Sequence, residues 1–119
     1  MKKIRLVLFF LLLVSQGALG VQNFYTGNTL MEYCKAGIEK NKDIEKANAC
    51  LGYVAGFEDL YESLVAVGLL QKKWCLPENA STSLLAATTL IYLTAHPDEL
   101  HLGASGLVIN AFREAYPCN

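Results

Sequence analysis

No stretch of this 119-residue sequence holds five charges of one sign, and Lys, Arg, Asp and Glu together make up only 18% of it. Ten basic residues stand against 11 acidic ones, so the chain lacks the basic surface with which proteins bind nucleic acids. The hydrophobic content of 53% excludes a disordered polymer. The sequence therefore indicates one small folded domain that does not bind nucleic acid.

The sequence also lacks the motifs of common catalytic and cofactor sites. It has no G-x-S-x-G, no P-loop and no dinucleotide-binding glycine pattern. Its two histidines, His96 and His101, stand with Asp98 and Glu99 in a short stretch without the spacing of a zinc-binding helix. That stretch is typical of a polar turn. We therefore expect no enzyme, no cofactor and no metal site.

The first 20 residues have the three parts of a secretory signal peptide. Three basic residues lie among the first five, an apolar run follows from Leu6 to Val14, and Ala18-Leu19-Gly20 completes a cleavage site. Nine apolar residues are too few for a membrane span, which needs about 20. The pattern predicts a signal peptide over residues 1–20, cleavage after Gly20 and a mature domain over residues 21–119. That domain would carry a net charge of −4 and no membrane anchor.

Two segments in the first half of the mature chain have the apolar spacing of helices. The first, residues 29–39, opens with the capping-box pattern Thr29-x-x-Glu32. The second, residues 47–67, places apolar side chains at steps of three and four and stops at Gly68. A polar stretch between them predicts the turn of a helical hairpin.

Two further helices are predicted in the second half, after an irregular segment that Pro77 keeps from being helical. One is capped within residues 81–83 and ends at His96, because Pro97 follows. The other begins near Ala104 and is stopped by Pro117. The fold class is therefore all-α, a small bundle of four main helices arranged as two antiparallel hairpins.

The four cysteines are placed symmetrically about the turns of these hairpins. The midpoint of Cys34 and Cys50 is position 42, in the first turn, and that of Cys75 and Cys118 falls between residues 96 and 97. Of the three possible connectivities, only Cys34–Cys50 with Cys75–Cys118 has this symmetry. A zinc site is the alternative, but there is no C-x-x-C, and export favours disulfides.

Two features of the second helix have alternative interpretations. Gly52 and Gly56 lie four apart and open one face for another helix, either within the fold, which we favour, or across a dimer. Glu58, Asp59 and Glu62 form an acidic cluster that could meet a basic partner. A solvated helix face is the more ordinary interpretation of that cluster.

Four segments of the mature chain resemble one family, the Rap/Tai immunity proteins for type VI secreted peptidoglycan amidases. The matching segments are Phe24 to Cys34, Cys50 to Gly56, Trp74 to Glu78, and Ala111 to Cys118 with the pattern Ala-Phe-x-x-Ala-Tyr-Pro-Cys. His96-Pro97 followed by His101-Leu102 is similar to the family's turn between its last two helices. The resemblance covers nearly the whole mature length.

The resemblance implies an all-helical periplasmic protein, commonly a homodimer, that binds its cognate amidase effector and occludes the active site. It would protect the producing cell and its siblings from delivered toxin. We place the family's cleft-entering loop on Leu76, Pro77, Glu78, Asn79, Ala80 and Ser81. A purely structural turn there, with partner contacts elsewhere, is the alternative. A second hypothesis for the whole chain is an exported accessory or structural envelope protein that has the fold but no toxin partner.

Overall fold

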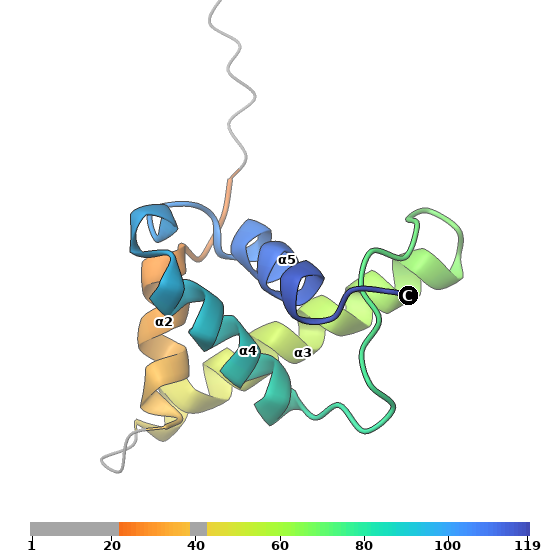
Figure 1. Cartoon of the computed structure of the whole chain (residues 1–119). Coiled ribbons are helices and arrows are strands. Elements are labelled where there is room, and N and C mark those ends of the chain that lie inside the picture. Colours follow the sequence, from red (N-terminus) through yellow and green to blue (C-terminus); the bar gives the residue numbers. More distant parts are fainter. Residues whose placement is uncertain (1–21, 39–42) are drawn as a thin grey trace, which may run out of the picture.

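The computed structural model describes residues 22–38 and 43–119 (Figure 1). These two ranges contain four α-helices and one short 3-10 helix: α2 (Gly27–Ala36), α3 (Ile44–Ala66), α4 (Thr82–Ala95), η1 (Pro97–Glu99) and α5 (Ala104–Ala115). The predicted all-α class and the number of main helices are confirmed. The predicted signal peptide and its cleavage after Gly20 lie outside the described residues.

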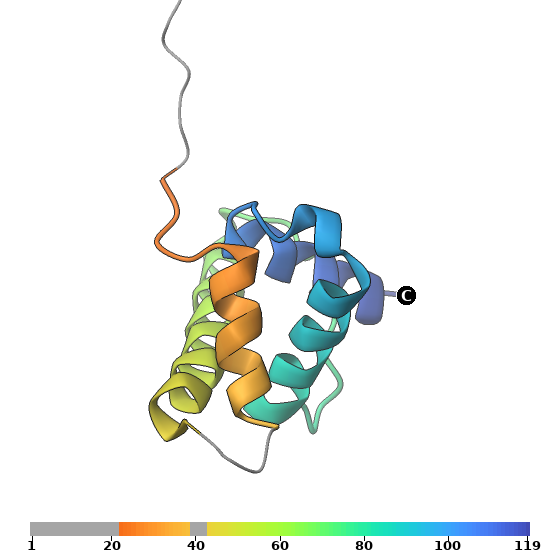
Figure 2. The same ribbon diagram turned by 90° about the vertical axis from the view of Figure 1, so that its left-hand side faces the viewer.

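The helices pair in chain order, as expected for two hairpins. α2 packs against α3, and α4 packs against α5. α4 also contacts α3 and α2, and Figure 2 shows α2 between α3 and α4. The C-terminal half of α3 extends beyond the other helices, alongside the segment that connects it to α4 (Figure 1). That connecting segment is therefore held mainly by α3 and by the end of α5.

The first helix begins two residues earlier than predicted. Thr26 is its N-cap, and the Thr26 hydroxyl accepts a hydrogen bond from the Thr29 backbone N–H at 3.4 Å. The predicted capping box at Thr29 and Glu32 is therefore wrong. Glu32 instead forms an ion pair with Lys46 on α3. Its side chain is therefore engaged in a contact between two helices and not in the cap that the local pattern predicted.

The start of α2 is fixed against the turn that precedes α5. The Gly27 N–H donates to Leu102 O and the Asn28 N–H to Leu100 O, both at 2.9 Å. Gly27 is buried, and a Cβ atom there would lie 2.5 Å from Leu107 Cδ1 and 2.9 Å from Leu100 Cα. This approach of two backbones is possible only because residue 27 has no side chain.

Gly27→Ala is expected to lower the free energy of unfolding by about 1 to 3 kcal/mol, the usual effect of overpacking against backbone. Gly106→Ala is the matched control, because Gly106 lies in α5 with open space where a Cβ would be. Its alanine is expected to change stability by less than about 1 kcal/mol and in the favourable direction. Urea unfolding of both variants measures the difference, and equal effects would contradict the close-packing argument.

α3 ends where the sequence predicted, at a glycine in the left-handed region. Gly68 has φ +77°, and the Leu69 N–H returns to Leu64 O at 2.9 Å. At the other end Asp43 caps the helix by accepting from the Lys46 N–H at 3.2 Å. Glycine at the C-terminus and aspartate at the N-cap are the ordinary chemistry of these positions.

Both predicted disulfides are confirmed. Cys34–Cys50 joins α2 to α3, and Cys75–Cys118 joins the segment before α4 to the tail after α5. In the described part of the chain no cysteine is free. Each bond therefore closes one hairpin, as the symmetry of the cysteine positions predicted.

One hydrophobic core runs through all four helices. Its fully buried large side chains are Trp74, Phe112, Leu30, Leu93, Leu107, Val54 and Val108. Trp74 is the member that no helix supplies, since it belongs to the α3–α4 connection. Within residues 22–38 and 43–119, no helix is both long and apolar enough to cross a membrane.

Candidate functional site

The segment predicted to meet a partner lies at the surface before α4. We call residues 76–81 the exposed loop. Pro77, Glu78 and Asn79 are exposed, and the Ala80 N–H donates to Pro77 O at 3.0 Å, which closes a turn. Ser81 accepts from the Leu84 N–H at 3.1 Å and so caps α4. The loop is thus a short, defined turn that presents Glu78 and Asn79 to solvent.

The base of the exposed loop is tied to the C-terminal tail. Cys75 forms the disulfide with Cys118, and its backbone N–H donates to Tyr116 O at 2.8 Å. The Tyr116 hydroxyl in turn forms a hydrogen bond with Thr88 on α4. Cys75 is therefore joined to the C-terminal tail, and Tyr116 of that tail is in turn bonded to the middle of α4.

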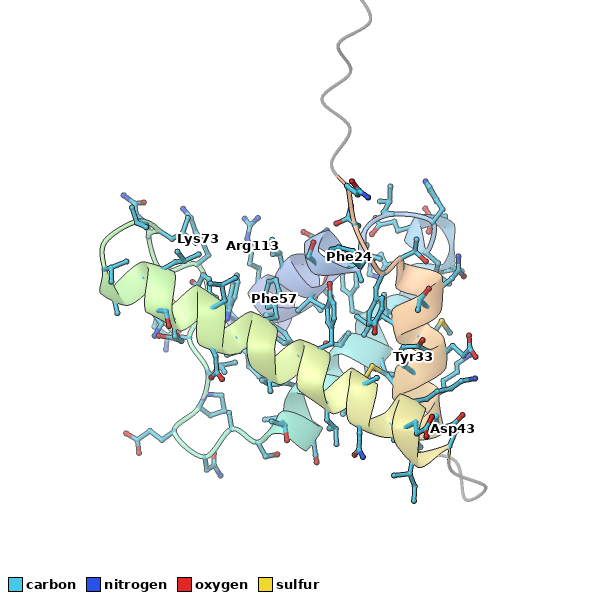
Figure 3. All side chains as sticks on the ribbon, turned by 180° about the vertical axis from the view of Figure 1, so that it is seen from behind. Phe24, Tyr33, Asp43, Phe57, Lys73 and Arg113 are labelled. Atoms are coloured by element: carbon cyan, nitrogen blue, oxygen red, sulfur yellow. A yellow bond between two sulfur atoms is a disulfide. The ribbon has the colours of Figure 1, made fainter. Side chains whose placement is uncertain are left out.

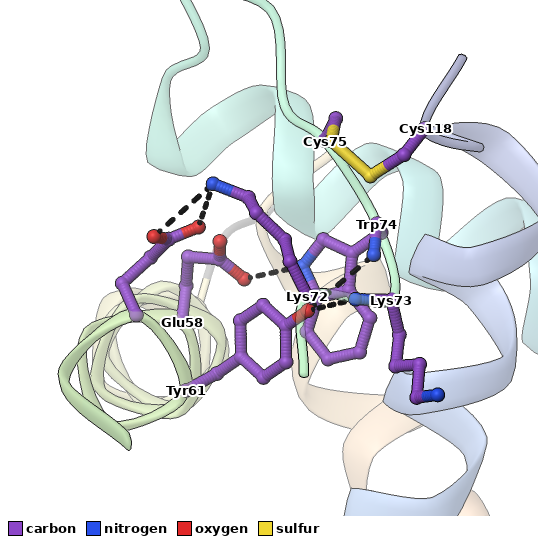
Figure 4. Close-up of a disulfide and its surroundings, with 8 residues drawn as sticks. Glu58, Tyr61, Lys72, Lys73, Trp74, Cys75 and Cys118 are labelled. Atoms are coloured by element: carbon purple, nitrogen blue, oxygen red, sulfur yellow. Dashed lines mark hydrogen bonds and ion pairs between the residues drawn. A yellow bond between two sulfur atoms is a disulfide. The ribbon is translucent and has the colours of Figure 1, made fainter. Parts of the chain in front are cut away.

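The residues just before Cys75 are held by α3, as Figure 4 shows. Trp74 is only 2% exposed, and its ring stacks on that of Tyr61 with 3.6 Å between ring centroids. The Trp74 Nε1–H donates to Glu58 Oε2 at 2.9 Å. The Tyr61 hydroxyl accepts from two consecutive backbone N–H groups, those of Lys73 and Trp74.

Glu58 is a buried carboxylic side chain, not part of a solvated face. It is 7% exposed, and burial raises its pKa, while the Trp74 hydrogen bond and Lys72 oppose that rise. Glu62 and Asp59 raise the pKa further. Glu62 forms an ion pair with Lys72 at 2.9 Å. The interpretation of the acidic cluster as a solvated face is therefore wrong for Glu58.

A signal for this burial was present in the spacing. Glu58 lies four residues after Val54 and three before Tyr61, which puts it on the buried stripe of α3. The glutamate at this position nevertheless predicted an exposed side chain, because glutamate is rarely buried without a partner. The partner, the Trp74 indole, is 16 residues away, and no local pattern shows it.

The raised pKa of Glu58 gives a testable pH dependence. The folded protein holds this proton more tightly than the unfolded chain, so this group's contribution to the free energy of unfolding falls as pH rises from the usual value of 4.5. Glu58→Gln keeps an oxygen acceptor for Trp74 but does not titrate. The stability of this variant relative to the native protein is therefore expected to rise between pH 4.5 and pH 7. Urea unfolding at both pH values measures it, and a parallel pH profile would contradict the assignment.

An apolar groove of about 300 Å³ lies beside the same segment. It is lined by Phe57, Leu60, Tyr61, Leu64, Leu70, Gln71, Lys73, Trp74 and Ile109. Figure 3 shows Phe57 and Lys73 along the edge of α3 that faces α5. Because Leu70, Gln71, Lys73 and Trp74 form one wall, displacement of this segment would alter the groove as well as the exposed loop.

Gly52 and Gly56 lie on an exposed face of α3. A Cβ atom at either position would meet nothing within 4 Å. In the described part of the chain, no neighbouring helix therefore packs on this face, and the favoured interpretation as an internal contact is not what the structure has. Contact between two copies, the other interpretation, stays a prediction.

The polar turn between α4 and α5 makes structural contacts. The His96 ring stacks on Tyr92, with 3.9 Å between centroids, and its Nδ1 lies 2.8 Å from Tyr92 O. The Tyr92 hydroxyl donates to Glu99 Oε2 at 3.0 Å. Nowhere in residues 22–38 and 43–119 do three His, Cys, Asp or Glu side chains gather as metal ligands.

Comparison with models of protein families gives a match over most of the chain. A family model described as Rap1a immunity proteins matches residues 26–118. This range contains all four helices, both disulfides and the exposed loop with the residues that hold its base. No curated protein matches the chain.

Proposed function

The chain belongs to the family of Rap1a immunity proteins, and on that premise we propose that it neutralises a peptidoglycan amidase delivered by a type VI secretion system. An immunity protein acts by binding a toxin, so its role is that of a non-enzymatic inhibitor. The observation that carries the proposal is the family match over residues 26–118, which agrees with the resemblance found in the sequence. Binding in the periplasm would protect the producing cell and its siblings.

The proposed mechanism is steric occlusion of the amidase active site by the exposed loop. Two features support it: the loop offers the polar groups of Glu78 and Asn79 to solvent, and its base is anchored by Cys75 and Trp74. A loop that already has its bound shape loses less conformational freedom on binding. Pro77 restricts the backbone further.

Periplasmic location is supported by the predicted signal peptide and by the two disulfides, which form in oxidising compartments. Mass spectrometry of the protein recovered from the periplasm tests this part. The expected mass is that of a chain beginning at Val21 with both disulfides formed.

A homodimer is also part of the proposal, as the resemblance implies. The open face of α3 at Gly52 and Gly56 offers a place where a second copy could approach closely. Sedimentation equilibrium of the purified protein measures this state, and a monomer at micromolar concentration would contradict it.

The direct test of function is co-expression with the product of the adjacent gene, which the proposal expects to be an amidase. The amidase is exported to the periplasm with and without this protein, and lysis is followed by optical density. Rescue from lysis supports immunity. Lysis without rescue, or the absence of a toxic neighbour, would instead favour an exported accessory or structural envelope protein.

Glu78→Lys is expected to weaken inhibition at least about tenfold while leaving folding nearly unchanged, because a charge reversal at an interface opposes the partner's electrostatic complementarity. Asp98→Lys is the matched control, since Asp98 is exposed in η1, which follows the end of α4 that is remote from the exposed loop. Inhibition titrations against the purified amidase measure both. Full inhibition by Glu78→Lys would point to another surface.

A further inference from the structure

The four residues that precede the exposed loop are held by contacts with side chains of α3 and with the C-terminal tail. We call residues 72–75 the clamped segment. Lys72 pairs with Glu62 at 2.9 Å, and the backbone N–H groups of Lys73 and Trp74 both donate to Tyr61 Oη. These contacts are made by side chains of α3, not by the backbone hydrogen bonds of a helix or a strand.

The remaining contacts complete the attachment at Trp74 and Cys75. The Trp74 indole N–H donates to Glu58 Oε2 at 2.9 Å, inside a buried site. Cys75 is fixed by its backbone bond to Tyr116 and by the disulfide to Cys118. Consecutive residues are therefore fixed from two sides, by α3 and by the C-terminal tail, immediately before the exposed loop begins (Figure 4).

We propose that Glu58 and Tyr61 are positioning residues for partner binding: by holding the clamped segment on α3, they set the direction in which the exposed loop leaves the body of the protein. The inference rests on the proposed function, because it assigns the exposed loop to the amidase cleft. Neither side chain contacts the partner. They act through Trp74 and the backbone of Lys73.

The position of the two acceptors supports this role. Tyr61 Oη and Glu58 Oε2 both lie on the face of α3 that meets the connection, and both receive N–H groups of that connection. The neighbouring residues 69–73 are exposed and have no helix or strand of their own. Without these acceptors, the Lys73 and Trp74 N–H groups would lose their side-chain hydrogen bonds to α3. The segment would then depend on the packing of the Trp74 ring, on the Lys72–Glu62 ion pair and on the attachments of Cys75. The preorganisation of the exposed loop would fall accordingly.

Tyr61→Phe is the first test, because it removes the acceptor and keeps the ring that stacks on Trp74. Tyr92→Phe is the matched control, since it also deletes a hydrogen-bonded hydroxyl of a buried tyrosine. Tyr92 lies near the C-terminal end of α4, whereas the exposed loop precedes the N-terminal end. Hydrogen exchange in the free protein is expected to become at least about tenfold faster at the amides of residues 73 and 74 in Tyr61→Phe only.

The affinity for the purified amidase is then measured by calorimetry for the same proteins. Tyr61→Phe is expected to bind about tenfold more weakly, the size of effect that one or two lost hydrogen bonds produce. Tyr92→Phe is expected to bind like the native protein. A purely structural role would lower the affinity of both variants in step with their stability.

Glu58 is tested by comparing two substitutions. Glu58→Gln keeps an oxygen for the Trp74 N–H, whereas Glu58→Leu removes it. Trp74 is the single tryptophan of the chain, so its fluorescence reports directly on this bond. The leucine variant is expected to shift the emission and to weaken binding several-fold, and the glutamine variant is expected to retain both properties.

The outcomes separate the two levels of the proposal. If the native protein does not bind the amidase, the proposed function is wrong and this inference is wrong with it. If the native protein binds and Tyr61→Phe and Glu58→Leu bind equally well, only the positioning role is overturned. Faster exchange at residues 73 and 74 together with weaker binding supports it.

Discussion

Replacing Cys75 and Cys118 together by serine is expected to lower the free energy of unfolding by about 4 kcal/mol and to reduce inhibition beyond what that loss explains. The bond links residues 43 apart in the chain, and closing a loop of this length restricts the unfolded state by about 4 kcal/mol. In the folded state the same bond holds the residue immediately before the exposed loop. Removal of the bond is therefore expected to lower the free energy of unfolding and also to loosen the attachment of the exposed loop.

The matched control is the Cys34/Cys50 double serine variant. That bond closes 16 residues between α2 and α3, so its loss is expected to cost about 3 kcal/mol without touching the connection before α4. Urea unfolding gives the two stabilities, and inhibition is then titrated at a temperature where both variants are folded. Equal inhibition by the two folded variants would contradict a local role for the Cys75–Cys118 bond.

The sequence predicted most of the fold because most of its information is local. Apolar residues three and four apart gave the helices, Gly68 and Pro97 gave two ends, and the symmetric cysteines gave the connectivity. The start of α2 was missed because two threonines, Thr26 and Thr29, stand within one turn of each other. The capping box also depended on Glu32, whose side chain is instead paired with Lys46.

The site was predicted less completely, because its contacts are nonlocal. The position of the exposed loop before α4 follows from Pro77 and from the serine cap. That Trp74 would be buried against α3 does not follow from any local pattern, since the irregular segment around it has no periodicity. Glu58 was noted only as part of an acidic cluster on the second helix, and Tyr61 had no assigned role. Their common role appears only when residues 58 to 75 are brought together in space.

Gly52 and Gly56 illustrate a different limit. The spacing of two glycines says that a close approach is possible, but it does not say which surface approaches. The structure places both on open surface, so the pattern describes either a contact with another copy or simply a helix face without large side chains.

Trp74→Ala is expected to be among the most destabilising single substitutions in the chain, at about 3 to 5 kcal/mol. Trp74 is one of the largest fully buried side chains, and its ring lies against those of Tyr61, Phe57 and Phe112. Alanine would leave a cavity between α3 and α5. It would also leave the carboxylate of Glu58 without its hydrogen-bond donor.

Trp74→Phe separates these two effects. Phenylalanine keeps most of the aromatic contact but has no N–H for Glu58, so it is expected to cost less than alanine and to act mainly through that carboxylate. Since the Trp74 hydrogen bond lowers the pKa of Glu58 against the rise caused by burial, its loss is expected to raise that pKa further. The stability of Trp74→Phe should therefore fall more steeply than that of the native protein as pH rises from 4.5. Adding Glu58→Gln to Trp74→Phe should remove the extra slope, because glutamine does not titrate. If the double variant kept the steep slope, a group other than Glu58 would have to be its source.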